Sequence, residues 1–152
     1  MQIDSYSNIS TSADYKSFVF ISEGRHGQLF KLVRFDELKE RANTFNLALG
    51  TVSSNGVVDY LGTSNNGDRN KILATVAQIT FLFLERYPDK CVYLTGSDQR
   101  RTLLYHRAIS YGYSELVQLF NIYGYNTRNF YDENFEPFSQ RGNYTGFLIE
   151  KR

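Results

Sequence analysis

A helix-period apolar stripe in the middle of the chain places the strongest constraint on the fold. The stripe repeats at i, i+4, i+7 and i+11 and consists of Ile72, Val76, Ile79 and Phe83. This spacing puts the four side chains on one helix face, and neighbouring apolar residues leave only a narrow polar face. We predict a helix over residues 69–86 that begins after Asp68 and ends before Pro88. It is expected to be the most buried helix of the protein.

The residues before this helix show the two-residue alternation of strands that are buried on one face. We predict strands over residues 15–22, 28–36, 43–52 and 57–62. The first two are separated by EGRHG, whose two glycines suit a hairpin, and Asn55-Gly56 is the strongest short turn signal in the chain. These strands are expected to form an antiparallel meander.

The residues after the helix alternate between strand and helix patterns. The continuous apolar run KCVYLTG predicts a central strand, and SDQRRTLLYHRAISYGY predicts a second helix capped by Ser97. A short helix over residues 114–121 and strands over 122–130 and 144–152 follow. The order predicts an α+β fold in one domain, residues 1–152. It consists of an antiparallel β meander followed by α-β-α-β-β, with two main helices packed on one sheet.

Composition limits the classes of function. The formal net charge of +1 excludes a uniformly basic nucleic-acid coat, so any basic site must be local. Aromatic residues make up 16% of the chain and should do much of the packing. The expected core comprises Phe20, Leu32, Leu47, Ile72, Val76, Ile79, Phe83, Val92, Leu94, Leu104, Ala108 and Phe147.

Few residues are available for metal or disulfide chemistry. Cys91 is the single cysteine and is expected to be a buried, inert thiol, and His26 and His106 cannot supply a metal site alone. No run approaches the roughly 18 apolar residues of a membrane span, and the N-terminus lacks a signal pattern. We therefore expect a cytoplasmic protein with no metal and no membrane association.

The start of the second helix carries residues suited to an anion. Thr95, Gly96 and Ser97 lie between the predicted central strand and this helix, and Arg100 and Arg101 lie in its first turn. The free N–H groups of a first helical turn carry about half a positive charge, to which the two guanidinium groups add. A plain turn with an N-cap explains the same residues without a ligand.

The start of the first helix is similar, with Asn66, Gly67, Arg69 and Lys71 in SNNGDRNK. Ordinary turn chemistry again explains these residues without a ligand. If the strands before the two helices are neighbours, both helix N-termini open on one edge of the sheet. A phosphate or carboxylate would then be held from two sides.

Arg101 is the most informative of these residues. Helical geometry places it on the same side as Leu104, Tyr105 and Ala108, whereas His106 projects toward a polar face beside Thr102. An arginine directed at the core is costly unless it is paired. Two explanations stay open: a ligand, or an internal partner such as a strand carbonyl, Asp59, Glu115 or Glu136.

Several blocks resemble a family of short bacterial proteins known only as a domain of unknown function. The most specific is VYLTGSDQRRTLLYHRAI, and SFVFISEGRHGQLFKLVRF, SNNGDRNKILATV, IYGY and EPFSQRGNYTGFLIEKR extend the resemblance over almost the whole chain. The resemblance implies a bacterial single-domain protein without an established activity. If the family uses this block as a site, the corresponding positions are Gly96, Ser97, Arg101 and Tyr105.

The order of elements is also similar, more loosely, to the second half of the acetyl-CoA-dependent N-acetyltransferases. That similarity implies CoA as cofactor, a pyrophosphate held by the loop before the first helix, and a tyrosine of a Leu-Tyr pair as general acid, here Tyr105. The loop NNGDRNK lacks the Arg/Gln-x-x-Gly-x-Gly pattern, and the usual first helices are missing. No cofactor is expected outside this reading.

The leading hypothesis is binding of a phosphate-bearing ligand, a nucleotide, CoA or RNA, at the two helix starts. One form of it is a toxin-like enzyme that cleaves RNA without metal, with Arg101, Tyr105 and His106 as catalytic residues and a small protein as partner. The alternatives are acyl transfer and a non-enzymatic interaction module that uses the aromatics of NIYGYNTRNFYDENF.

Overall fold

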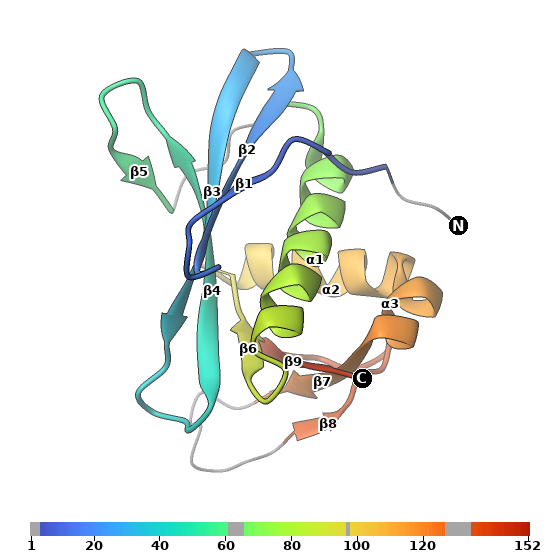
Figure 1. The fold of residues 1–152 in the computed structure, drawn as a ribbon. Helices are drawn as coiled ribbons and strands as arrows, with labels where there is room; N and C mark the ends of the chain where they lie inside the picture. Colours follow the sequence, from blue (N-terminus) through green and yellow to red (C-terminus); the bar gives the residue numbers. More distant parts are fainter. Residues whose placement is uncertain (1–3, 61–65, 97, 127–134) are drawn as a thin grey trace.

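A computed structural model describes residues 4–60, 66–96, 98–126 and 135–152 (Figure 1). The elements in order are β1 (Ser10–Thr11), β2 (Ser17–Gly24), β3 (Gly27–Glu37), β4 (Thr44–Val52), β5 (Val58–Asp59), α1 (Arg69–Arg86), β6 (Cys91–Leu94), α2 (Gln99–Tyr111), α3 (Tyr113–Leu119), β7 (Phe120–Tyr125), β8 (Phe135–Pro137) and β9 (Gly146–Lys151). The predicted α+β class is confirmed. The ends of the predicted strands 57–62 and 122–130 lie outside the described residues.

Within the described residues all strands belong to one sheet, in the order β1-β2-β3-β4-β6-β9-β7-β8, with β5 on the edge of β4. β2 to β5 form the predicted antiparallel meander, and β1, which was not predicted, adds to it by pairing antiparallel with β2. β6 lies in the middle of the order, as its continuous apolar run indicates. It pairs with β4 in parallel, and this pairing covers only residues 44–46 and 91–93. The two halves of the sheet are therefore joined by a very short ladder.

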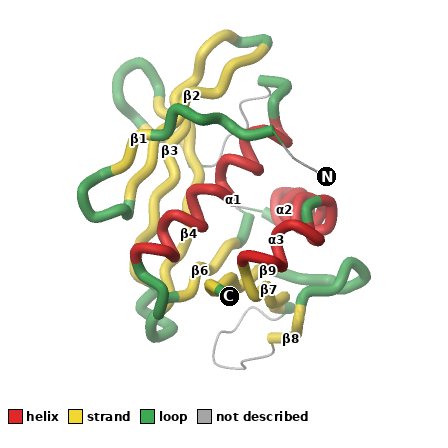
Figure 2. The backbone as a smooth tube through the Cα atoms, turned by 45° about the vertical axis from the view of Figure 1, so that its right-hand side comes forward, coloured by secondary structure: helices red, strands yellow, loops and turns green. Residues whose placement is uncertain are grey.

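The helices cover one face of the sheet (Figure 2). α1 is the most buried of them, as predicted: seven of its side chains are buried, against two in α2 and none in α3. Phe83 is 0% exposed, and its ring stacks on Phe35 of β3 with 4.1 Å between ring centroids. Phe45 of β4 packs edge-on against the same ring. Aromatic packing thus ties α1 to the meander.

Nine of the twelve predicted core residues are buried, whereas Leu32, Leu104 and Ala108 are only half-buried. In β3 the odd-numbered residues, Val33 among them, face inward, whereas Leu32 is even-numbered. The sequence of β3 has apolar residues at both parities, so its alternation is ambiguous. Pairing decides it, because Val33 lies directly opposite Phe18 on the buried face.

The helix caps differ in part from the prediction. α1 begins after Asp68, but the Asp68 carboxylate makes no capping hydrogen bond. α2 begins after Asp98, whose carboxylate accepts a hydrogen bond from the backbone N–H of Arg101 at 2.9 Å. The N-cap of α2 is therefore Asp98, because its extended backbone aims the carboxylate at the first turn. Ser97, the predicted cap, lies outside the described residues.

The remaining expectations concern thiol, metal and membrane. Cys91 is half-buried, not buried, and burial raises the pKa of its thiol, with the nearby Glu150 carboxylate adding to the rise. Among the described residues there is no group of three or more potential metal ligands. No described helix has the length and apolar character needed to cross a bilayer.

Phe83→Ala tests the aromatic tie between α1 and the meander. The substitution removes a fully buried ring that contacts two other buried rings, so the free energy of unfolding should fall by about 3–5 kcal/mol. Phe30→Ala is the matched control, because this ring is 51% exposed and its loss should cost less than about 0.5 kcal/mol. Urea denaturation of both variants measures the difference, and equal costs would contradict the assigned core.

Candidate functional site

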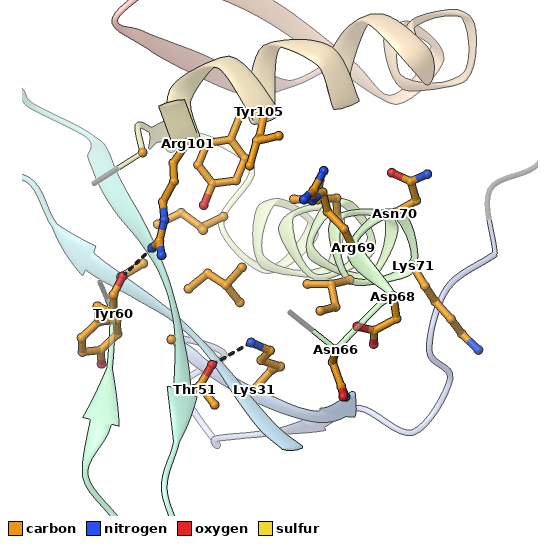
Figure 3. A pocket seen from close by; sticks show the side chains of 18 of the residues that line it. Lys31, Thr51, Tyr60, Asn66, Asp68, Arg69, Asn70, Lys71, Arg101 and Tyr105 are labelled. Atoms are coloured by element: carbon orange, nitrogen blue, oxygen red, sulfur yellow. Dashed lines mark hydrogen bonds between the residues drawn. The ribbon is translucent and has the colours of Figure 1, made fainter. Parts of the chain in front are cut away.

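The main cavity of the molecule opens where β4 and β6 part. Pairing of these parallel strands ends at Asn46 and Tyr93. Beyond that point β4 continues along β3, while the chain after β6 leads into α2. The space between them holds a cavity of about 1120 Å³, lined by β4, by the segment after β6 and by the first turns of α1 and α2 (Figure 3). Parallel strands of open sheets commonly place ligands outside their carboxyl ends.

The predicted convergence of the two helix starts therefore occurs. It is brought about by β4, because β6 and β5, the strands that precede α2 and α1, pair with opposite ends of the same edge of β4. Both helix N-termini thus line one cavity, and their partial positive charges add there.

The described lining of the cavity is electropositive. Its charged side chains are the cations Arg25, Lys31, Arg69, Lys71, Arg100 and Arg101 and the acids Asp4, Asp68 and Asp98. Six cations against three acids leave an excess of three positive charges in this cavity, whereas the whole chain carries only +1. The positive charge of the chain is therefore concentrated here, as expected for a local basic site.

Arg101 extends from the first turn of α2 into the cavity (Figure 3). One terminal nitrogen donates a hydrogen bond to the backbone carbonyl of Tyr60 at 3.2 Å. Within the described residues Arg101 forms no ion pair, so the internal partner is a carbonyl and not a carboxylate. A carbonyl orients the guanidinium without neutralising it. Arg101 is half-buried and Arg100 exposed, which confirms that the two arginines differ in burial.

Lys31 of β3 is a site residue that the sequence reasoning missed. Its side chain is 5% exposed, and its ammonium donates to the hydroxyl of Thr51 at 2.7 Å. Desolvation lowers the pKa of Lys31, and Arg101 lowers it further, while Asp68 and Asp59 act in the opposite direction. Lys31 and Arg101 point into the cavity from opposite walls (Figure 3).

A signal for Lys31 does exist in the sequence. It shares the parity of Val33 and Phe35, so a cation stands at an inward position of a strand. The predicted core contained Leu32, the neighbour of Lys31. Neighbouring residues of a strand face opposite sides, so Lys31 would then face outward, as an ordinary surface lysine does.

Asp68 anchors a polar network beneath the start of α1. One carboxylate oxygen accepts hydrogen bonds from Ser22 at 2.6 Å and from Tyr6 at 2.5 Å. Among the described residues the other oxygen is buried without a hydrogen-bond partner. Burial, followed by the hydrogen bond to Asp68, raises the pKa of the Tyr6 hydroxyl. The network fixes the start of α1 to β2 and to the N-terminal segment.

Asn66 and Gly67 lie at the cavity but have structural roles there. The Asn66 amide nitrogen donates to Ser22 and to the carbonyl of Gly27, each at 3.0 Å, and its oxygen accepts from the backbone N–H of His26 at 2.7 Å. These bonds fasten the β2–β3 hairpin to the start of α1. Gly67 has φ +86°, a conformation that favours glycine. The side chain of Asn66 is thus already engaged.

The cations of α1 are directed differently. Arg69 is exposed and points toward α2, whereas Lys71 turns away from the cavity centre (Figure 3). The Lys71 ammonium lies 3.7 Å from the Asp4 carboxylate and 4.3 Å above the ring of Tyr6. Of the two predicted residues, Arg69 is the one free to meet a ligand.

Thr95 and Gly96 make contacts within the protein. The Thr95 hydroxyl donates to the carbonyl of Thr145 at 2.8 Å, and the Gly96 N–H donates to the Thr102 hydroxyl at 3.0 Å. A Cβ atom on Gly96 would lie 2.4 Å from the backbone nitrogen of Thr102. The close backbone approach at Gly96 is therefore made by the first turn of α2. Ser97 lies outside the described residues.

Tyr105 lies one turn beyond Arg101 and lines the same cavity. Its burial raises the pKa of the hydroxyl, an effect that the Arg101 charge opposes. The hydroxyl is therefore protonated at neutral pH and can donate a hydrogen bond or a proton. This arrangement matches the position expected for it from helical spacing.

His106 does not line the cavity, and the prediction of a polar face around it is wrong, because its half-buried ring lies against aromatic rings. Its ring packs against Phe138, Tyr144 and Phe147, with centroid distances of 5.0, 5.7 and 6.2 Å. Its Nε2 lies 3.3 Å from the carbonyl of Ser139. The aromatic segment before β9 folds over this face of α2, a contact that helix spacing alone does not reveal.

Comparison with known proteins addresses the family and not the chemistry. No curated protein and no solved structure matches the chain significantly. A family described only as a family of unknown function, DUF6934, matches residues 2–152. Because the match spans nearly the whole sequence, the protein belongs to this family of unknown function.

Proposed function

We propose that the protein binds a phosphate-bearing small molecule in the cavity between β4 and β6. The observation that carries the proposal is the convergence of two helix N-termini and six cationic side chains on one cavity. Backbone N–H groups at helix starts and arginine forks are the groups that proteins use to hold phosphate. Arg101, Lys31 and Arg69 are the residues that would hold it.

CoA is the phosphate-bearing ligand that suits this cavity best. Between the end of pairing with β6 at Asn46 and the start of pairing with β5 at Thr51, β4 presents an edge to the cavity. A free strand edge hydrogen-bonds to a ligand that carries amide groups of its own. CoA has both phosphates and an amide-containing arm, whereas a simple nucleotide has only the phosphates.

The other hypotheses receive less support. Metal-free RNA cleavage was expected to combine Arg101, Tyr105 and His106, but His106 packs among aromatic rings outside the cavity. An interaction module was expected to use the exposed aromatics of residues 121–135, yet among the described ones Tyr125 is 1% exposed and Tyr123 and Phe135 are half-buried. Residues 127–134 of that segment lie outside the described part of the chain.

Acyl transfer is the second candidate, and the protonated Tyr105 in the cavity favours it. In such a reaction an acceptor amine forms a bond to the acyl carbon, and the carbon–sulfur bond of the CoA thioester breaks. The departing thiolate takes a proton from the Tyr105 hydroxyl, and the amine releases its proton to solvent. Solvent then restores the proton of Tyr105.

The two arginines provide the first test of the proposed ligand. Arg101→Lys keeps the charge but loses the planar fork, so affinity for CoA should fall by about 1.5–3 kcal/mol. Arg100→Ala should weaken binding mildly, in a manner that fades with added salt, because this side chain is exposed.

Titration calorimetry and melting temperatures of the two variants separate the outcomes. For the wild type, ligand at 100 times its Kd should stabilise the protein by about 2.7 kcal/mol. A large loss of stability in Arg101→Lys without a loss of affinity would assign Arg101 a structural role. Absence of binding to CoA, ADP and inorganic phosphate would refute the proposal as a whole.

Lys31→Met tests whether the buried ammonium serves binding. The free energy of unfolding at neutral pH should change by less than about 1 kcal/mol, because loss of the hydrogen bond to Thr51 is offset by relief of the desolvation cost. CoA affinity should fall by about 1.5–3 kcal/mol, the scale of a hydrogen bond to a charged group. Unchanged affinity would remove Lys31 from the site.

The same pair of proteins gives a pH test. The pKa of Lys31 is lowered from 10.5 in the folded state, so between the lowered value and 10.5 the unfolded chain binds more protons. Wild-type stability should therefore rise relative to Lys31→Met as the pH increases through this window. CoA affinity of the wild type should fall over the same window as the ammonium loses its proton.

Tyr105→Phe tests the second candidate. The variant should keep CoA affinity within about threefold but lose about 10²–10⁴-fold in thiol release from acetyl-CoA with a panel of amine acceptors. Thiol release is followed with a colorimetric thiol reagent. Equal rates for wild type and variant, or no release by the wild type, would reject acyl transfer through Tyr105.

A further inference from the structure

A second cavity lies beside the first, between α1 on one side and α2 and α3 on the other. Its volume is about 610 Å³, and side chains of β6, β7 and β9 form its floor. Ala74 and Ala77 of α1 and Ala108 of α2 line it, and these small side chains leave the space between the helices unfilled. The described lining is mostly apolar, with Arg69, Arg107 and Glu115 as its charged members and Ser5, Asn70, Gln78 and Thr80 as further polar ones.

The two cavities adjoin along the facing sides of α1 and α2. They share the lining residues Arg69, Asn70, Leu73, Leu104, Tyr105 and Tyr111. Along α1 the side chains that face this space change from Arg69 and Asn70 in the first turn to Leu73 and then to alanines. A molecule that spans both cavities would therefore meet cations at one end and hydrocarbon at the other.

The rim of the second cavity also exposes apolar surface. Tyr111 and Leu119 line it while remaining 56% and 43% exposed. Exposed apolar side chains that gather around an open apolar cavity are typical of a ligand-binding site. Leu119 does not line the cationic cavity, whereas Tyr111 lines both.

We infer that the apolar cavity takes the acyl chain of a CoA thioester whose phosphates lie in the cation-lined cavity. The inference rests on the proposed function and narrows it to thioesters with a chain of several carbons. The lining that the apolar cavity shares with the cationic cavity favours one amphiphilic ligand over a separate partner. A helix of another protein would use the apolar groove without needing the cations beside it.

The test measures how tightly the protein binds CoA thioesters of increasing acyl length. Free CoA and its acetyl, butanoyl, octanoyl and dodecanoyl thioesters are titrated calorimetrically below their micelle concentrations. Affinity should rise with length, by up to about fourfold for each methylene that enters the apolar cavity, and should level off when the cavity is full. Free CoA that binds as tightly as dodecanoyl-CoA overturns the inference and leaves the proposed function intact. Failure of free CoA and of every thioester to bind rejects CoA as the ligand of the proposed function.

Cavity-filling variants show where the chain lies. Ala77→Phe and Ala108→Phe each put a ring into the apolar cavity at positions that do not line the cationic one. In both variants octanoyl-CoA should bind no more tightly than acetyl-CoA. Affinity for free CoA should stay within about twofold of the wild-type value, which also shows that the variant is folded. Ala42→Phe, at an exposed loop position, is the matched control and should keep the tighter binding of octanoyl-CoA. Tighter binding of octanoyl-CoA that persists in both cavity variants would contradict the inference.

Discussion

The short parallel ladder between β4 and β6 is the constraint on which the rest of the structure depends. Three residue pairs join the antiparallel meander to the C-terminal strands, whereas β3 and β4 pair over eight. Strands twist relative to their neighbours, so two sheet halves held over so short a distance are free to separate beyond it. α1 connects the halves as a crossover and covers the joined end with its apolar stripe (Figure 1). The cavity lies beyond the end of the ladder, where the strands no longer pair.

The buried face of the meander is apolar near the ladder and polar near the cavity. Near the ladder it carries Phe35 and Leu47, which pack under the later turns of α1. Toward the cavity it carries Ser22, which donates a hydrogen bond to Asp68 at the start of α1, and Lys31, which donates one to Thr51. Burying a cation and hydroxyls costs stability unless each finds partners. The aromatic end of the sheet offsets this cost, so one sheet supports both a packed core and a polar cavity.

The candidate site could be predicted from the sequence in part. The two helix starts, the inward direction of Arg101 and the distinct burial of Arg100 follow from helical spacing and turn residues, which are local. The inward direction of Lys31 was not predicted because both the odd-numbered and the even-numbered positions of β3 contain apolar residues. Only pairing with β2 and β4 defines the inward face. The aromatic neighbours of His106 were not predicted because residues 138–147, distant in the sequence, supply the rings that pack against it. Gly96 was predicted to let a ligand approach the backbone closely, but the first turn of α2 occupies the space beside it.

The sequence by itself determined the elements of this protein: the bounds of α1, the meander, the central place of β6 and the presence of two cationic helix starts. These features rest on periodicity, caps and turns, which act over a few residues. Only the tertiary structure decided that β4 and β6 are parallel neighbours that soon part, that Lys31 faces inward, and that a polar cavity adjoins an apolar one between α1 and α2. Such features depend on which distant segments pair and on how well helices with small side chains fill the space between them, and local sequence does not encode either.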